Sequence, residues 1–283
     1  VVDLPLDASR PPTQSFRGAE IVFTLGAERS TGLKRLAREH QASLYMVLLT
    51  LLKVLLHRYT GARDIVVGSP VAGRQHGDLQ DQIGPFLNTL PIRTFPDGSL
   101  SFITFLEQVR RTCLEAFEHQ QYPFDRLVDD LAVERDLSRS PVFDVMMILQ
   151  NQDDATPMFD GVHSHLLAGH TGTSKVDVTL CCKDVGDKIW ANLEYNTDLF
   201  SADRMQRMAD HLARLVDSIL TAPAKEISQL DYLTESEEKL LLHGWNATRS
   251  DYPRERTVID LIDETTRNFR DQIAVVAPDR CLT

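Results

Sequence analysis

"LYMVLLTLLKVLL", Leu44 to Leu56, is the longest apolar run of the chain, and only Thr50 and Lys53 interrupt it. The run is too short to cross a bilayer, which takes about 20 apolar residues in a helix. It therefore predicts a buried helix that continues to about Tyr59, with Ser43 placed to cap its first turn.

Composition places the 283 residues among ordinary globular proteins with a sizeable core, at 42% hydrophobic and 25% charged. The formal charge of -11 argues against a nucleic acid or an anionic membrane as partner, because both are bound by clustered Lys and Arg. The first residues have neither the basic region nor the apolar core of a signal peptide. The four cysteines have neither disulfide nor metal-site spacing: Cys113, Cys181, Cys182 and Cys281. This favours a reducing compartment, so we expect a cytoplasmic protein.

The segments around the apolar run alternate between strand and helix patterns, which predicts an α/β fold. In the last part of the chain Ile189, Ala191 and Leu193 alternate with polar or amphipathic neighbours, as in one strand of a hairpin. The sequence predicts strands at 19–25, 64–73, 83–95 and 141–151, helices at 26–41, 101–119 and 201–220, and a β-hairpin at 173–200.

Polar, proline-containing stretches divide the chain. Residues 1–19 lack periodicity and indicate a connector, 20–222 form the main unit, and 223–256 indicate a linker. Residues 257–283 begin a helix and then a strand, but a piece of about 30 residues cannot bury a core of its own. We therefore expect this piece to be the start of a further domain.

Known catalytic patterns are missing from the sequence, which has no G-x-S-x-G, no H-E-x-x-H, no Walker loop and no dinucleotide-binding glycine fingerprint. His163, His165 and His170 form a cluster, and alternation along a strand would place His163 and His165 on one face as a possible metal-binding pair. No third ligand follows at a suitable spacing. A solvated strand edge is the better interpretation of these histidines.

Three polar strings stand out within apolar surroundings: "IGPFLNTLPIR" (83–93), "HQQYPFDRLV" (119–128) and "RDLSRSPVFD" (135–144). In the first, Asn88 lies in an extended apolar segment, where an unsatisfied amide is costly. Asn88 therefore either ties down a neighbouring backbone or faces a solvated channel.

The second string predicts an elbow between two helices. Tyr122 precedes a proline and is pushed out of helical geometry, while Pro123 can open the next helix. We expect the two rings of Tyr122 and Phe124 to anchor the elbow and the glutamine amides to cap backbone groups, with His119 at a helix C-terminus. In the third string Arg135, Asp136 and Arg139 around Ser138 indicate a surface ion-pair network.

Together and in this order, the strings resemble the later core motifs of condensation domains of non-ribosomal peptide synthetases. Those motifs read approximately I-G-x-F-x-N-T-x-x-x-R, then H/N-Q-x-Y-P-F-E/D, then R-D-x-S-R-x-P-x-F. Residues 57–74 and 193–200 resemble the flanking family segments, and the sequence after 240 is similar to a condensation-to-adenylation linker followed by the opening of an adenylation domain. Gln121 and Ser140 depart from the family's common acidic residue and asparagine.

The resemblance implies a chloramphenicol-acetyltransferase-like fold: two αβα lobes that meet in a V, each with a mixed sheet and flanking helices. A tunnel between the lobes takes the phosphopantetheine arms of a donor and an acceptor carrier protein. The family's catalytic His-His-x-x-x-Asp-Gly lies in the N-terminal lobe, and no His-His pair occurs in these 283 residues. We therefore expect a C-terminal lobe with no catalytic residue, no metal and no cofactor bound directly, inactive alone in amide formation.

The resemblance also implies partners and site residues. The partners are two peptidyl carrier proteins, the N-terminal lobe and the adjacent adenylation domain. Alternatives are a docking platform without catalysis, an epimerisation or heterocyclisation branch of the same fold, which "NTLPIR" disfavours, and least of all a free-standing acyltransferase using coenzyme A. The residues implied at the tunnel wall or lobe interface are Asn88, Thr89, Arg93, His119, Gln120, Tyr122, Pro123, Arg135, Asp136 and Arg139.

Overall fold

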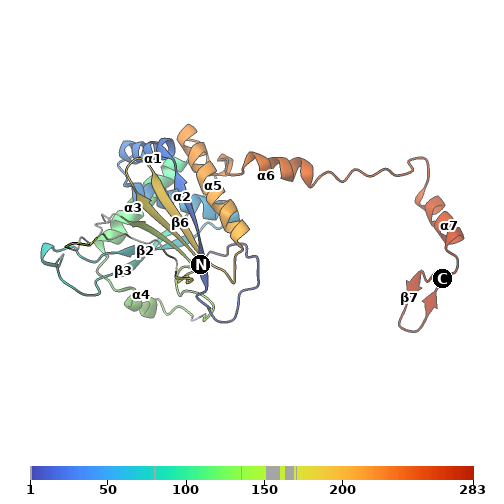
Figure 1. Ribbon diagram of the computed structural model, residues 1–283, viewed down its shortest axis with the longest axis horizontal. Coiled ribbons are helices and arrows are strands. Elements are labelled where there is room, and N and C mark those ends of the chain that lie inside the picture. The colour runs from blue at the N-terminus through green and yellow to red at the C-terminus, as the bar shows by residue number, and fades with distance from the viewer. Residues whose placement is uncertain (1, 80, 135, 151–159, 163–168, 170) are drawn as a thin grey trace. The chain divides into compact units, whose positions relative to one another are not determined.

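A computed structural model describes the chain except for residues 1, 80, 135, 151–159, 163–168 and 170. The chain forms two compact units, Val1–Thr234 and Glu235–Thr283. In the first unit, helices cover a six-stranded sheet (Figure 1). This unit is called the lobe below.

The apolar run forms the central helix, α2 (Leu44–Thr60), as predicted. The Ser43 hydroxyl accepts a hydrogen bond from the Met46 amide at 3.2 Å and so caps the first turn. Gly61 ends the helix in the left-handed conformation, with φ of 69°. Every residue from Met46 to Leu56 is buried, so α2 is surrounded by the rest of the lobe.

The sheet is mixed, with strand order β1-β6-β5-β4-β2-β3. The β5–β4 and β4–β2 pairs are parallel, and the other pairs are antiparallel. The predicted hairpin is confirmed as β5 and β6, and the strand predicted at 83–95 is shorter, since it begins only at Asn88. The strands are β1 (Gly18–Leu25), β2 (Ile65–Val71), β3 (Asn88–Thr94), β4 (Val145–Gln150), β5 (Val178–Asp184) and β6 (Ile189–Asn196).

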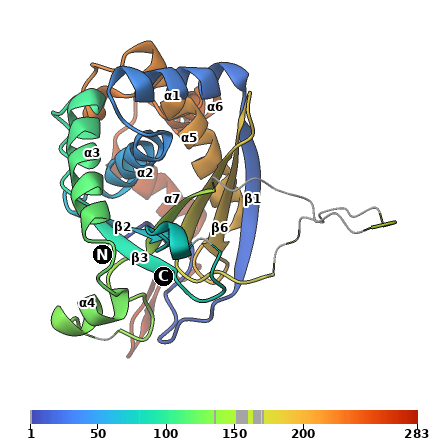
Figure 2. The ribbon, with the colours of Figure 1, turned by 90° about the vertical axis from the view of Figure 1, so that its left-hand side faces the viewer.

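One face of the sheet is covered by α2 together with α1 (Ala27–Glu39), α3 (Phe102–Glu118) and α5 (Ala202–Thr221), as Figures 1 and 2 show. The opposite face carries side chains that are exposed or half-buried, such as Val22, Trp190 and Asn192. The short helix α4 (Phe124–Asp130) follows α3 and lies near β3. Within the part of the chain that the structure describes, the lobe therefore has one covered and one open sheet face.

Lys53 is the one charged side chain in the buried part of α2, and it is fully buried itself. Its Nζ donates to the Ile65 carbonyl of β2 at 3.0 Å and to the Ile92 carbonyl of β3 at 2.8 Å. Burial lowers the pKa of Lys53 to about 7. The side chain thus joins the edge strand β3 to β2 from beneath the sheet.

The polar segments at both ends of the lobe pack against its core. Near the N-terminus Val2 and Leu4 are buried, and in the stretch predicted as linker Ile227 and Leu230 are buried as well. Arg58 donates to the carbonyls of Ile227 and Leu230 at 2.7 and 2.8 Å. The packing of the lobe therefore extends to residue 234, twelve residues beyond residue 222, where the sequence places the end of the main unit.

The second unit has little core. Its apolar side chains, Ile259 and Trp245 among them, are mostly exposed. Among the described residues no single helix is long and apolar enough to span a membrane. The second unit contains α6 (Glu235–Lys239), which continues as a π-helix (Leu240–Gly244), then α7 (Val258–Asn268), β7 (Val275–Val276) and β8 (Cys281–Leu282).

Replacing Lys53 with methionine should flatten the pH dependence of stability in the alkaline range. The folded lobe releases the Lys53 proton near pH 7, whereas the unfolded chain holds it to about pH 10.4. The free energy of unfolding of the wild type should therefore rise with pH across this window, by at most about 1.4 kcal/mol per pH unit. Urea unfolding at neutral and alkaline pH measures the slope.

The matched control is Lys188→Met at an exposed position, which should keep the wild-type slope. An unchanged slope in Lys53→Met would show that Lys53 does not titrate in this range.

Candidate functional site

Asn88 is the first residue of β3, and its amide holds three backbone groups of the elbow. Its Nδ2 donates to the carbonyl of Gln120 at 2.9 Å and to that of Tyr122 at 2.8 Å. Its Oδ1 accepts from the Phe124 amide at 3.0 Å. Of the two roles open to Asn88 from the sequence, the structure shows the tie to a neighbouring backbone.

The elbow joins α3 to α4, as predicted. His119 is the C-cap of α3, and the Gln120 side chain caps the helix end by donating to the Phe117 carbonyl at 2.8 Å. Pro123 is the N-cap of α4 rather than its first helical residue, with φ of -64° and ψ of 137°. Its fixed φ still directs the chain into α4.

The expectation that both rings anchor the elbow is wrong for Tyr122. The residue is 48% exposed, and its hydroxyl donates to Asp130 of α4. Phe124 alone packs inward, against Phe143 with ring centroids 5.5 Å apart. A ring on the solvent side contributes little burial energy, so the Asn88 hydrogen bonds and Phe124 hold the elbow.

Phe143 connects the third string to the second in space, as Asn88 connects the first to the second. It is 3% exposed and lies between Phe124 and Gly68 of β2. A Cβ at Gly68 would come within 2.3 Å of the Phe143 ring, so only glycine permits this contact. The contact brings the end of the third string against the elbow and the sheet, and no local pattern in the sequence predicted it.

The loop before β3 is folded by Gly73 and Arg74. Gly73 has φ of +67°, and a Cβ there would come within 1.9 Å of the Phe86 carbonyl oxygen. The Arg74 guanidinium lies over the Phe86 ring, 4.4 Å from its centroid, and donates to the Leu79 carbonyl. Between this loop and the elbow lies a groove of 380 Å³, lined by Gly73, Gln75, Leu79, Pro85, Phe86, Leu87, Asn88, Gln120, Gln121 and Pro123.

The third string forms part of a half-buried charge cluster, so the prediction of a surface ion-pair network is wrong for Arg139. Arg139 donates to Asp144, which is 1% exposed, at 3.2 Å. Arg10 forms a two-pronged pair with Asp177, which is 3% exposed, and also donates to the Ser138 carbonyl at 3.1 Å. Burial, together with the nearby Asp177, raises the pKa of Asp144 to about 6.

The predicted site residues separate into groups. Asn88, Gln120, Tyr122 and Pro123 meet at the elbow, and Thr89 follows Asn88 in β3. His119 is exposed beside them.

The other predicted residues lie away from the elbow. Arg93, near the opposite end of β3, forms a two-pronged pair with Asp64 at 2.8 and 2.7 Å. Asp136 accepts a hydrogen bond from the Ser138 amide at 2.8 Å. Arg135 and the histidines at 163, 165 and 170 lie outside the described residues.

Three of the four cysteines are unsuited to nucleophilic chemistry. Burial raises the pKa of the Cys113 and Cys182 thiols to about 12 and that of Cys181 to about 11, so these three are not thiolate nucleophiles near neutral pH. Across the described residues there is no group of three or more His, Cys, Asp or Glu that could hold a metal ion. The elbow positions backbone and amide groups along the groove.

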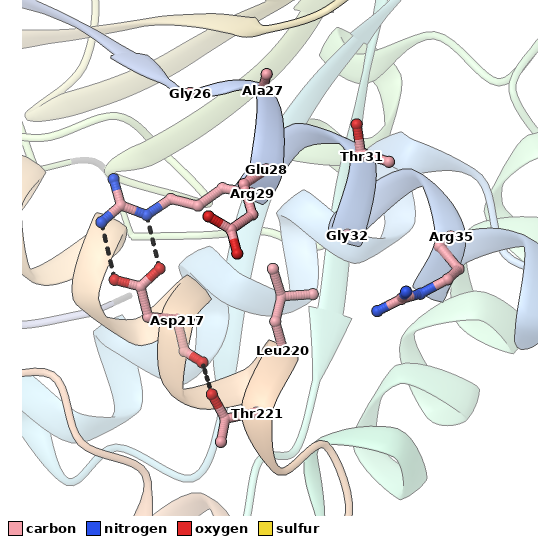
Figure 3. A pocket seen from close by; sticks show the side chains of 10 residues that line it. All are labelled: Gly26, Ala27, Glu28, Arg29, Thr31, Gly32, Arg35, Asp217, Leu220 and Thr221. Carbon is pink, nitrogen blue, oxygen red and sulfur yellow. Dashed lines mark hydrogen bonds and ion pairs between the residues drawn. The ribbon is translucent and has the colours of Figure 1, made fainter.

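A larger hollow of 950 Å³ lies between the N-terminal end of α1 and α5 (Figure 3). Arg29 of α1 binds Asp217 of α5 across it, with contacts of 2.7 and 2.8 Å. Because this arginine is already paired and the three strings contribute no lining residue, we place the candidate site at the elbow.

Comparison with known proteins identifies the family. The sequence model of the Condensation domain matches residues 1–242. The chain belongs to the condensation-domain family. Over its whole length it is 40% identical to bacitracin synthase 3 of Bacillus licheniformis and 38% identical to tyrocidine synthase 3 of Brevibacillus parabrevis. It spans 4% of the length of each of these two synthases.

Solved structures agree with the family. Holo-AB3403, a four-domain nonribosomal peptide synthetase bound to AMP and glycine, matches with a TM-score of 0.83 at 23% identity, over all of this chain and 22% of that one. The X-domain from teicoplanin biosynthesis matches with a TM-score of 0.78 at 26% identity, over 82% of this chain and 53% of that one. The predicted chloramphenicol-acetyltransferase-like fold class is confirmed.

Asn88→Ala should destabilise the lobe by about 2–4 kcal/mol, because it removes three hydrogen bonds at once. Gln120→Ala, which removes one side-chain hydrogen bond in the same elbow, should cost about 1 kcal/mol. Urea unfolding of both variants gives the comparison. Equal losses in the two variants would contradict the central place of Asn88.

Asp144→Asn should change the acid side of the stability profile. In the folded lobe Asp144 binds its proton below about pH 6, whereas an unfolded aspartate does so below about 3.9. Its contribution therefore falls as pH rises from about 4 to 6, and Asp144→Asn should remove that decline. Thermal unfolding across this range measures the difference between variant and wild type.

Asp136→Asn is a control because Asp136 should change the stability with pH in the opposite direction to Asp144. Hydrogen bonds from Ser138 lower the pKa of Asp136, so its contribution is lost as pH falls through that lowered pKa. If both variants showed the same change in the pH dependence of thermal stability, the opposite pKa shifts of Asp144 and Asp136 would be contradicted.

Proposed function

We propose that this chain is the C-terminal lobe of a condensation domain in a non-ribosomal peptide synthetase, followed by a linker and the first residues of an adenylation domain. The observation that carries the proposal is the meeting of the three strings at one place: Asn88 ties the elbow, and Phe143 packs behind it. The match of the family model to residues 1–242 supports the condensation part.

In this proposal the elbow and the loop before β3 form one wall of a tunnel between two lobes. Ile83 is fully exposed and Leu87 is 79% exposed on that loop, which supports an apolar partner surface there. The partner is the N-terminal lobe, which in this family carries the His-His-x-x-x-Asp-Gly sequence. Thr89, which follows Asn88, belongs to the same wall.

The reaction is attack of an acceptor aminoacyl amine on the thioester of a donor acyl or peptidyl group. Both groups are carried on phosphopantetheine arms of carrier proteins, and this lobe binds no cofactor of its own. Holding two tethered groups in reacting geometry supplies rate enhancement without a proton-transferring residue in the wall. The adjacent adenylation domain is the further partner, and the cytoplasm is the compartment.

The isolated 283-residue chain should form no amide bond when mixed with a loaded donor and a loaded acceptor carrier protein. The parent polypeptide, by which we mean the synthetase of the proposal with both lobes of the condensation domain, should form it. The reason is that no His-His pair occurs in the chain. Mass spectrometry of the carrier-bound product measures the outcome. Product from the isolated chain would contradict the assignment as a lobe without the catalytic histidine.

In the parent, Asn88→Ala should lower turnover and leave carrier-protein affinity unchanged, since the elbow shapes the wall and is not the docking surface. Unchanged turnover, with carrier-protein affinity that survives Asn88→Ala, would instead support the alternative, a docking platform.

A further inference from the structure

Residues 2–10 run along the lobe and are fastened to it at three points. Asp3 accepts from Arg139 at 2.5 Å. Asp7 accepts from Arg204 at 2.6 Å and from the Ser201 hydroxyl at 2.8 Å, and its amide donates to the Leu199 carbonyl at 2.9 Å. Arg10 holds Asp177 and the Ser138 carbonyl. We call residues 2–10 the entry arm.

The innermost of these contacts are buried. The Arg10 side chain is 14% exposed and that of Asp177 is 3% exposed, and Asp144 beside them is 1% exposed. Removing one partner from a buried ion pair leaves the other charge without compensation, which is far more costly than losing a surface pair. A two-pronged arginine contact also fixes direction, because both nitrogens must face the carboxylate.

The same cluster leads to the elbow. Arg10 donates to the Ser138 carbonyl of the third string, and Arg139 of that string bonds to the buried Asp144. Asp144 directly follows Phe143, which packs on Phe124. The second contact of Arg139, with Asp3 of the entry arm, lies at the surface, since the Asp3 side chain is 80% exposed. A shift of the arm therefore acts on the third string and through Phe143 on the elbow. The contacts join residues that are distant in sequence, as with Arg10 and Asp177, which lie 167 positions apart.

We propose that Arg10 and Arg139 are positioning residues that lock the entry arm in one direction, so that the arm sets where the preceding lobe stands relative to the elbow. The inference rests on the proposed function, in which a lobe precedes this chain. It assigns to residues 2–10, which the sequence indicated only as a connector, the role of a rigid arm. Neither arginine contacts the reacting groups, and both act through the geometry of the two lobes.

Hydrogen exchange in the 283-residue chain tests the lock itself. The amide of Asp7 donates to the Leu199 carbonyl and reports on the arm, and the amide of Gln14, which donates to the Leu137 carbonyl, reports on the segment directly after it. Arg10→Met should raise exchange in peptides covering these amides by at least about tenfold, with β5 and β6 unchanged. Arg10→Lys should fall in between, because a lysine keeps the charge but not the two-pronged contact.

Arg17→Met is the matched control. Arg17 lies on the same N-terminal segment, but its side chain is 73% exposed where it pairs with Asp198, so the variant should exchange like the wild type. Arg10→Met combined with Asp177→Asn should recover part of the protection, because no buried charge is left alone. Wild-type exchange in Arg10→Met, or a rise spread equally over the sheet, would overturn the lock.

The parent polypeptide tests the consequence. Arg10→Met should lower kcat for amide formation by about 10- to 100-fold with KM for the loaded acceptor carrier unchanged, as expected when geometry and not binding is disturbed. Arg10→Lys should recover part of kcat, and Arg17→Met should match the wild type. An unchanged kcat alongside faster exchange would overturn the positioning role. Absence of amide formation in the wild-type parent would instead overturn the proposed function, and the lock would then be judged on exchange alone.

Discussion

The hydrogen bonds between the Asn88 amide and the elbow backbone are the constraint on which the candidate site depends. An edge strand and a corner between two helices share no ladder of backbone hydrogen bonds, so side-chain contacts must fix their relative position. One asparagine satisfies two carbonyls and one amide of the corner. Phe143 fills the space behind them against Gly68, and Lys53 fastens the same strand, β3, from beneath the sheet. β3 and the elbow are therefore fixed from two sides.

Local patterns in the sequence were sufficient for most elements. The apolar run predicted α2 and its Ser43 cap, and alternation predicted the β5–β6 hairpin, because each signal lies within one element. The same reasoning limited Asn88 to two roles, one of which the structure shows. The exposure of Tyr122 was not foreseen, since a ring beside a proline is equally compatible with an inward and an outward position.

Contacts between distant segments could not be predicted in this way. Arg139 was expected on the surface, because no pattern indicates that Asp144 is buried or that Asp3, near the start of the chain, pairs with Arg139. The stretch after residue 222 resembles a linker because Ile227 and Leu230 are isolated apolar residues in polar surroundings, yet both are buried. Charged pairs and single apolar anchors carry no periodicity, and they fasten both ends of the lobe.

The open sheet face, the exposed apolar loop before β3 and the proposed lock of the entry arm are all consistent with one lobe of a two-lobed domain. The most direct measurement is photo-crosslinking from position 87 in the parent polypeptide, with p-benzoylphenylalanine in place of Leu87 and identification of the linked peptide by mass spectrometry. We expect links to a preceding lobe that carries a His-His sequence, as the proposed function requires. Links confined to residues 1–283, or to the sequence downstream of them, would contradict it.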